Sequence, residues 1–101
     1  MARARMEELE FEWDDAKARL NFEKHGVTFE EAMEVFLDPE IAPRRDDRKD
    51  YGEDRQRVVG LTRDGAKTLT VIYTERTRGA TKTIRIISAW MVKDNSKGGN
   101  Q

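Results

Sequence analysis

The chain has 101 residues, a formal net charge of -1, no Cys and one His. This length supports one domain with a single small core. The lack of Cys excludes disulfides, thiolate metal sites and a cysteine nucleophile, and a single His argues against a histidine zinc site. No apolar run approaches the ~20 residues of a membrane span, and residues 1–10 are too charged for a signal peptide. The sequence therefore predicts a cytoplasmic protein.

The charge is divided unevenly along the chain. Residues 1–53 carry 9 Lys and Arg against 16 Asp and Glu, whereas residues 54–93 carry 9 against 3. A basic surface suits a polyanion, and an acidic surface suits solvent or a basic partner. The alternative is that the 39% of charged residues merely keep a small domain in solution. Composition alone supports both interpretations.

The chain starts with a stretch of weak pattern. Residues 1–10 are charged and aperiodic, so we expect a frayed start. Residues 9–13 alternate apolar and acidic side chains, which predicts a short edge strand.

A helix is predicted next. Asp14 or Asp15 can cap it, Ala16 and Leu20 are expected to point inward, and the helix runs to about His25. Gly26 follows as the residue that ends it in a left-handed conformation.

A second helix begins at a capping box formed by Thr28 and Glu31. Its apolar residues recur at helical spacing and predict a core face, made by Phe29, Ala32, Met33 and Phe36. Asp38-Pro39 ends this helix. The loop expected over residues 46–54 is too polar to bury.

From Arg55 onward the apolar period changes to two. Strands are predicted around residues 58–61, 69–73 and 84–86, with a hairpin turn at 63–65. We therefore expect an α+β domain over residues 1–93, in which two N-terminal helices pack on a mainly antiparallel meander and leave its other face open. Residues 94–101 have no periodicity and are expected to be a disordered tail.

Several polar residues together suit RNA cleavage without a metal. That reaction needs a base for the 2′-hydroxyl proton, cations for the charged phosphorane and an acid for the leaving oxygen. The side chains that offer these groups are Lys24, His25, Arg55, Glu75, Arg76 and Arg85. Each also has an ordinary explanation: His25 as a solvated helix end, Glu75 with Arg76 as a surface ion pair, and Arg85 as half of a cross-strand pair.

Four segments resemble the BrnT family of type II toxin–antitoxin systems, over about residues 11–89. They read F-E-W-D-D-A-K-A-R-L-N-F-E-K-H-G-V-T-F-E-E-A-M-E-V-F-L-D-P, Y-G-E-D-R-Q-R-V-V-G, V-I-Y-T-E-R and R-I-I-S-A. The resemblance implies a small RelE-like ribonuclease toxin that is neutralised by a ribbon-helix-helix antitoxin. The expected complex has two copies of each chain and represses its own operon. No cofactor and no metal are implied.

The family motifs, taken with the chemistry above, predict the site residues. The catalytic set is His25, Arg55, Glu75 and Arg85, and the RNA-binding set is Lys17, Lys24 and Arg76. One position departs from the family pattern, because Trp90 stands where an arginine usually follows R-I-I-S-A. The alternative function is therefore a weakened toxin that acts only through antitoxin pairing and regulation.

Overall fold

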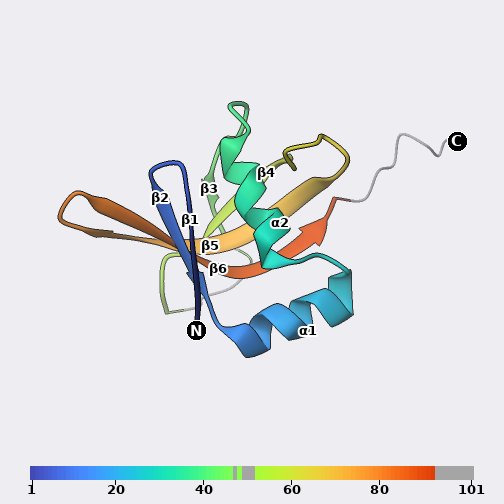
Figure 1. Ribbon diagram of the computed structural model, residues 1–101, viewed down its shortest axis with the longest axis horizontal. Helices are drawn as coiled ribbons and strands as arrows, with labels where there is room; N and C mark the ends of the chain where they lie inside the picture. The colour runs from blue at the N-terminus through green and yellow to red at the C-terminus, as the bar shows by residue number, and fades with distance from the viewer. Residues whose placement is uncertain (47, 49–51, 93–101) are drawn as a thin grey trace, which may run out of the picture.

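The computed structural model describes residues 1–46, 48 and 52–92. Over these residues it shows a six-stranded sheet in the order β1-β2-β6-β5-β4-β3, with two α-helices and one 3-10 turn (Figure 1). In chain order the elements are β1 (Ala2–Met6), β2 (Leu9–Trp13), α1 (Asp15–His25), α2 (Phe29–Glu34), η1 (Val35–Leu37), β3 (Arg44–Arg45), β4 (Gln56–Leu61), β5 (Thr68–Arg78) and β6 (Thr81–Met91). The α+β class is confirmed.

The arrangement of the sheet differs from the predicted meander with two leading helices. β4, β5 and β6 are antiparallel as expected, but β2 runs parallel to β6, with Phe11 opposite Ile84. The β1–β2 hairpin also precedes both helices. A parallel pair needs a long crossover connection, and the chain between β2 and β6 supplies it. The sheet is therefore mixed.

The first residues form a strand where a frayed start was expected. Because this strand, β1, takes the edge of the sheet, the strand predicted at residues 9–13 is present as β2 but is not an edge strand. Arg3 lies opposite Glu12 and Arg5 opposite Glu10, with N to O distances of 3.9 and 3.8 Å in the two ion pairs. The other side of β1 packs against the core through Ala2, Ala4 and Met6. Alanine has a low propensity for strands. The alternation of alanine and arginine in β1 therefore did not predict a strand.

The bounds predicted for α1 are confirmed. Asp14 caps its first turn, and Gly26 ends it with a φ of 70°. The inward orientation predicted for Ala16 and Leu20 is wrong, because Ala16 is exposed and 62% of Leu20 is exposed. α1 lies along the edge of β6 beyond the end of β2 (Figure 1), and the only buried residue of the helix is Asn21. It therefore contacts the sheet through one narrow side.

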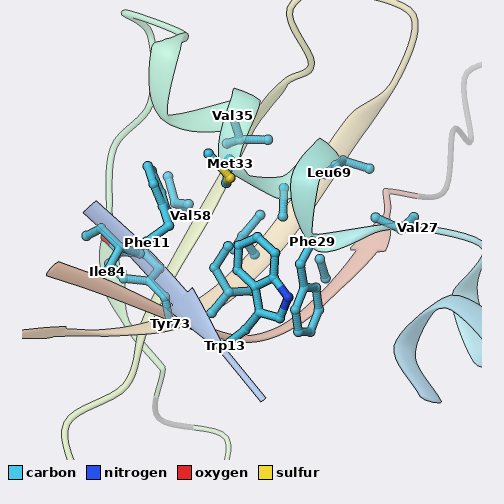
Figure 2. Close-up of a cluster of buried hydrophobic side chains, with 14 residues drawn as sticks. Phe11, Trp13, Val27, Phe29, Met33, Val35, Val58, Leu69, Tyr73 and Ile84 are labelled. Carbon is cyan, nitrogen blue, oxygen red and sulfur yellow. The ribbon is translucent and has the colours of Figure 1, made fainter. Parts of the chain in front are cut away.

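α2 covers one face of the sheet and closes the hydrophobic core (Figure 2). The capping box of Thr28 and Glu31 is present. The core contribution of the predicted helix is confirmed for Phe29, Ala32 and Met33, while Phe36 is partly buried. The aromatic rings meet edge to face, with centroids 5.9 Å apart for Trp13 and Phe29 and 5.0 Å apart for Phe36 and Tyr73. Such contacts favour one packed arrangement.

The charged connection after β3 is less exposed than expected. The side chain of Asp46 is fully buried, so the prediction that residues 46–54 are too polar to bury is wrong at this position. Burial is tolerated because Arg48 donates two side-chain hydrogen bonds to the two carboxylate oxygens, at 2.9 and 3.0 Å. The predicted tail, residues 94–101, lies outside the described residues.

Candidate functional site

The sheet has two faces, and α2 covers only one of them. On β5, the side chains directed away from α2 are those of Thr70, Ile72 and Thr74, because they alternate with the core residues Leu69, Val71 and Tyr73. On β6, Trp90 pairs with Thr70 and Arg85 pairs with Thr74. Trp90 and Arg85 therefore share the face opposite α2. We call it the loop face, because Arg48 of the β3–β4 connection lies over Trp90.

A groove lies on the loop face where the end of α1 meets the end of β6. It is lined by Lys24, His25, Arg48, Ser88, Trp90 and Met91, and we call it the α1–β6 groove. The ring centroids of His25 and Trp90 are 6.0 Å apart. The guanidinium carbon of Arg48 lies 5.1 Å from the centroid of the Trp90 ring, which is a cation–π distance. The groove thus combines an imidazole, two cations and an aromatic surface.

Asn21 fixes the helical side of this groove. Its Nδ2 donates to the carbonyl oxygens of Ala89 and Val27, at 2.8 and 3.1 Å. Its Oδ1 accepts from the backbone N of Ala89 at 3.1 Å and from Ser88 Oγ at 3.2 Å. All four hydrogen-bonding positions of the amide are thereby filled. In the part of the chain that the structure describes, no strand pairs with β6 here on its α1 side, so the amide takes that role. His25, one turn further along α1, is held against the end of β6.

Asp46 fixes the opposite side of the groove. Its carboxylate accepts from Nε and Nη2 of Arg48, and one oxygen also accepts from the Arg48 backbone N at 3.4 Å. A guanidinium held through two parallel hydrogen bonds keeps its orientation. About half of the Arg48 side chain is nevertheless exposed. The groove therefore has a cation that is oriented before any ligand arrives.

Arg85 lies nearer the middle of the loop face, in an ion pair. Its Nη1 donates to Oε2 of Glu12 at 3.0 Å, and the two residues are opposite each other in the parallel ladder. Their side chains are 23% and 12% exposed. Arg3 approaches the other carboxylate oxygen of Glu12 at 3.9 Å. The cross-strand ion pair that the sequence left open as the ordinary explanation for Arg85 is present.

Arg55 continues the line of β4 towards Arg85. It precedes Gln56 in the chain, which places it beside Thr74, and Thr74 pairs with Arg85. Arg55 Nε donates to Glu53 at 3.0 Å. Among the described residues, the buried Oγ1 of Thr74 has no hydrogen-bond partner. Thr74 therefore lies between the two predicted arginines.

Glu75 and Arg76 do not act together, because adjacent residues of a strand point to opposite faces. Glu75 pairs with Ile84 of the core face and makes an ion pair with Lys82 at 3.2 Å. Arg76 pairs with Thr83 on the loop face. Only Arg76 of this pair shares a face with the groove.

The predicted residues of the loop face therefore form two groups, with Lys24 and His25 in the groove and Arg76 and Arg85 farther along the sheet. Arg55 belongs to neither group, because it lies beside Asp46, whose backbone N donates to the Arg55 carbonyl oxygen at 2.8 Å. A strand rises ~3.3 Å per residue, so the five residues from Trp90 to Arg85 correspond to about 15 Å. Lys17 is exposed on α1, about two turns before His25. A single phosphate therefore does not contact both the groove residues and Arg85.

Two perturbed groups lie near these residues. Burial raises the pKa of Tyr73 to about 12, and the charge of Glu75 adds to this shift, so the phenol stays protonated near neutral pH. The pKa of Asp14 is lowered, first by the hydrogen bond from the backbone N of Lys17 and also by the charge of Arg85. Asp14 therefore serves as a charged helix cap.

Arg48 and Ser88 are groove residues that the sequence analysis did not identify. Arg48 belongs to a run of charged residues in which no spacing distinguishes one position from the next. Ser88 follows a β-bulge between Ile72 and Tyr73 of the facing strand. Only the register of the folded sheet reveals which side of β6 it occupies.

Residues 13–95 match the family described as ribonuclease toxin, BrnT, of type II toxin–antitoxin system. The chain belongs to the BrnT family. BrnT proteins are the toxin components of such systems, so this chain is a ribonuclease toxin that works with an antitoxin partner.

The resemblance inferred from the four sequence segments is confirmed by this match. No curated protein matches this BrnT chain. None of the helices in the described ranges is long and apolar enough to cross a membrane.

Proposed function

We propose that this BrnT protein is a metal-independent endoribonuclease whose active site is the α1–β6 groove. One observation carries the proposal: His25, Lys24 and Arg48 meet around Trp90 in a single groove on the loop face. The family supplies the substrate class.

The groove has the groups that RNA cleavage needs. In this reaction the 2′-oxygen bonds to phosphorus, the bond to the 5′-oxygen breaks, and the proton moves from the first oxygen to the second. His25 is the group for proton transfer, since an imidazole both accepts and donates near neutral pH. Lys24 and Arg48 stabilise the charge that develops on the phosphorane. Trp90 offers an aromatic surface for a base.

The arginines farther along the sheet bind the RNA backbone. Arg85 and Arg76 share the loop face but lie about 15 Å or more from Trp90 along the sheet. Arg55 lies beside Asp46, whose backbone N donates to the Arg55 carbonyl oxygen. Lys17 adds a cation on the exposed side of α1. Glu75 points to the other face, so it is not part of the proposed reaction.

The antitoxin partner is proposed to be a ribbon-helix-helix protein. This DNA-binding module dimerises, so the complex has two copies of each chain, binds operator DNA and represses its own operon in the cytoplasm. Size measurement of the co-expressed pair tests this proposal. A complex with one copy of each chain would contradict it.

A second candidate is a weakened toxin that acts only through its antitoxin. The observation in its favour is that Arg85 is engaged by Glu12 while position 90 holds a tryptophan. A neutral indole does not stabilise phosphorane charge as an arginine does. This candidate predicts antitoxin binding without RNA cleavage.

An RNA cleavage assay with and without EDTA separates the two candidates. We expect cleavage that survives EDTA and falls by about 10²–10⁴ in His25→Gln, the usual contribution of a proton-transfer group. Arg63→Ala, at an exposed turn, is the control and should cleave normally. Absence of cleavage by the unmodified chain supports the second candidate, and equal cleavage by His25→Gln contradicts the proposed site.

A further inference from the structure

Two arginines face each other across the edge of the sheet. Arg44 of β3 pairs directly with Arg57 of β4, and both are exposed. Like charges directly opposite each other in a ladder are destabilising. Within residues 1–46, 48 and 52–92, neither arginine makes an ion pair. The repulsion between the two guanidinium groups lowers the stability of the fold. An anion bound between them would remove this repulsion.

The surroundings of this pair suit an anion. A hollow of about 460 Å³ adjoins it and is lined by Glu40, Ala42, Arg44, Arg45, Arg57 and Val59. The lining thus contains three arginines and one glutamate. Asp54 makes its ion pair with Arg45, at 3.5 Å, and Arg45 is adjacent to Arg44 in β3, so its side chain points to the opposite face from the facing pair. Two guanidinium forks on one face match the oxygens of a phosphodiester.

The pair lies on the same face as the α1–β6 groove. Arg57 pairs with Ile72, and Ile72 pairs with Ser88 of the groove. Strands are ~4.8 Å apart, so the distance from Arg57 to Ser88 across the sheet is about 10 Å. Arg48 starts from the β3 side of the sheet and reaches Trp90 on β6. Cations therefore extend across the strands from the groove to the edge.

We propose that Arg44 and Arg57 form a second phosphate-binding subsite, which holds the backbone of the RNA a few nucleotides from the bond cleaved in the groove. The proposal rests on the proposed function of that groove. With this subsite, the bound RNA runs across the strands of the sheet, from the groove at β6 to the edge at β3. RNA is favoured over an acidic protein because the path continues from the groove along one line of cations.

The test measures RNA affinity at several salt concentrations in a His25→Gln background, which prevents cleavage. The probe is a single-stranded RNA of mixed sequence, followed by fluorescence anisotropy. Arg44→Ala with Arg57→Ala removes two phosphate contacts, so the slope of log affinity against log salt should fall by about 1.4. The loss of affinity between 50 and 200 mM salt should then be about sevenfold smaller than in the unmodified background. Arg63→Ala is the matched control and should change neither quantity.

A charge reversal provides an independent readout. Arg44→Glu places opposite charges in the same cross-strand pair, so the melting temperature should rise while RNA affinity falls. A falling melting temperature would show that the pair is not repulsive in the free protein and would overturn the proposal.

The outcomes separate this inference from the proposed function. If the His25→Gln protein does not bind RNA at all, the proposed function fails. If it binds RNA and the double arginine variant binds with the same affinity and slope, only the subsite fails. Binding of a glutamate-rich peptide that is lost in the double variant, with RNA affinity unchanged, would assign the pair to a protein partner and overturn the assignment to RNA.

Discussion

The guanidinium group of Arg48 lies over the ring of Trp90, with 5.1 Å between the guanidinium carbon and the ring centroid. Asp46 holds the same guanidinium through two hydrogen bonds. The tryptophan at position 90 therefore does not leave the groove without an arginine, because Arg48 brings one from another part of the chain.

This relationship predicts the behaviour of Arg48→Lys. A lysine ammonium is a point charge that does not reproduce both the paired hydrogen bonds and the stacking on Trp90. Losing one positioned donor typically lowers the rate by about 10²–10³, so we expect a loss of this size in RNA cleavage. Arg63→Lys is the control. A normal cleavage rate in Arg48→Lys would show that Arg48 does not contact the reacting phosphate.

The ion pair of Arg85 and Glu12 predicts that removing Arg85 lowers stability and RNA binding but changes kcat little. Arg85→Ala leaves the largely buried carboxylate of Glu12 without its closest partner, which should lower the free energy of unfolding by about 1–2 kcal/mol. Because Arg85 is about 15 Å from the groove, KM should rise while kcat stays within a few-fold. Urea unfolding and steady-state kinetics measure the two effects.

A double-mutant cycle serves as the control for this prediction. Glu12→Gln combined with Arg85→Ala should cost less stability than the sum of the two single changes. A kcat lowered a hundredfold in Arg85→Ala would place Arg85 at the reacting phosphate and contradict the proposed location of the active site.

Asn21 is predicted to be the most sensitive polar residue of α1. Asn21→Asp replaces the donor that serves the carbonyl oxygens of Ala89 and Val27 and adds a buried charge. We expect a loss of about 3 kcal/mol or more of unfolding free energy. Lys17→Ala, at an exposed position of the same helix, should cost under about 0.5 kcal/mol. Equal thermal stability of the two variants would show that the amide does not anchor the helix.

The capping box of α2 predicts a pH dependence of stability. The pKa of Glu31 is lowered from its ordinary value of 4.5, first by the side-chain hydrogen bond from Lys67 and also by the backbone of Thr28. A lowered folded pKa means that the stabilisation is present above pH 4.5 and is lost as the pH falls through the lowered value.

Thermal melts of the unmodified protein and Glu31→Gln between pH 7 and pH 3 measure this effect. The difference in melting temperature should be largest near neutral pH and shrink at acid pH. A difference that stays constant over this range would show that the charge of Glu31 does not contribute.

Features that depend on neighbouring residues could be predicted from the amino-acid sequence alone. The capping box of α2, the ends of α1 and the turn after β4 follow from hydrogen bonds within a few residues, so they could be predicted. The family also followed from short motifs, because their order along the chain carries the information. His25 and Lys24 were identified as one pair for the same reason, since they occupy the same helical turn.

Features that depend on pairing between distant segments became visible in the folded domain. The parallel pairing of β2 with β6 placed α1 at the sheet edge, where Leu20 is exposed and Asn21 is buried. The strand period put Glu75 and Arg76 on opposite faces, although a pair of adjacent charges had suggested one site. Arg48 reaches Trp90 from 42 positions earlier in the chain. Sequence spacing contains no information about such contacts, because the register of the sheet and the path of the loop are set by packing of the whole domain.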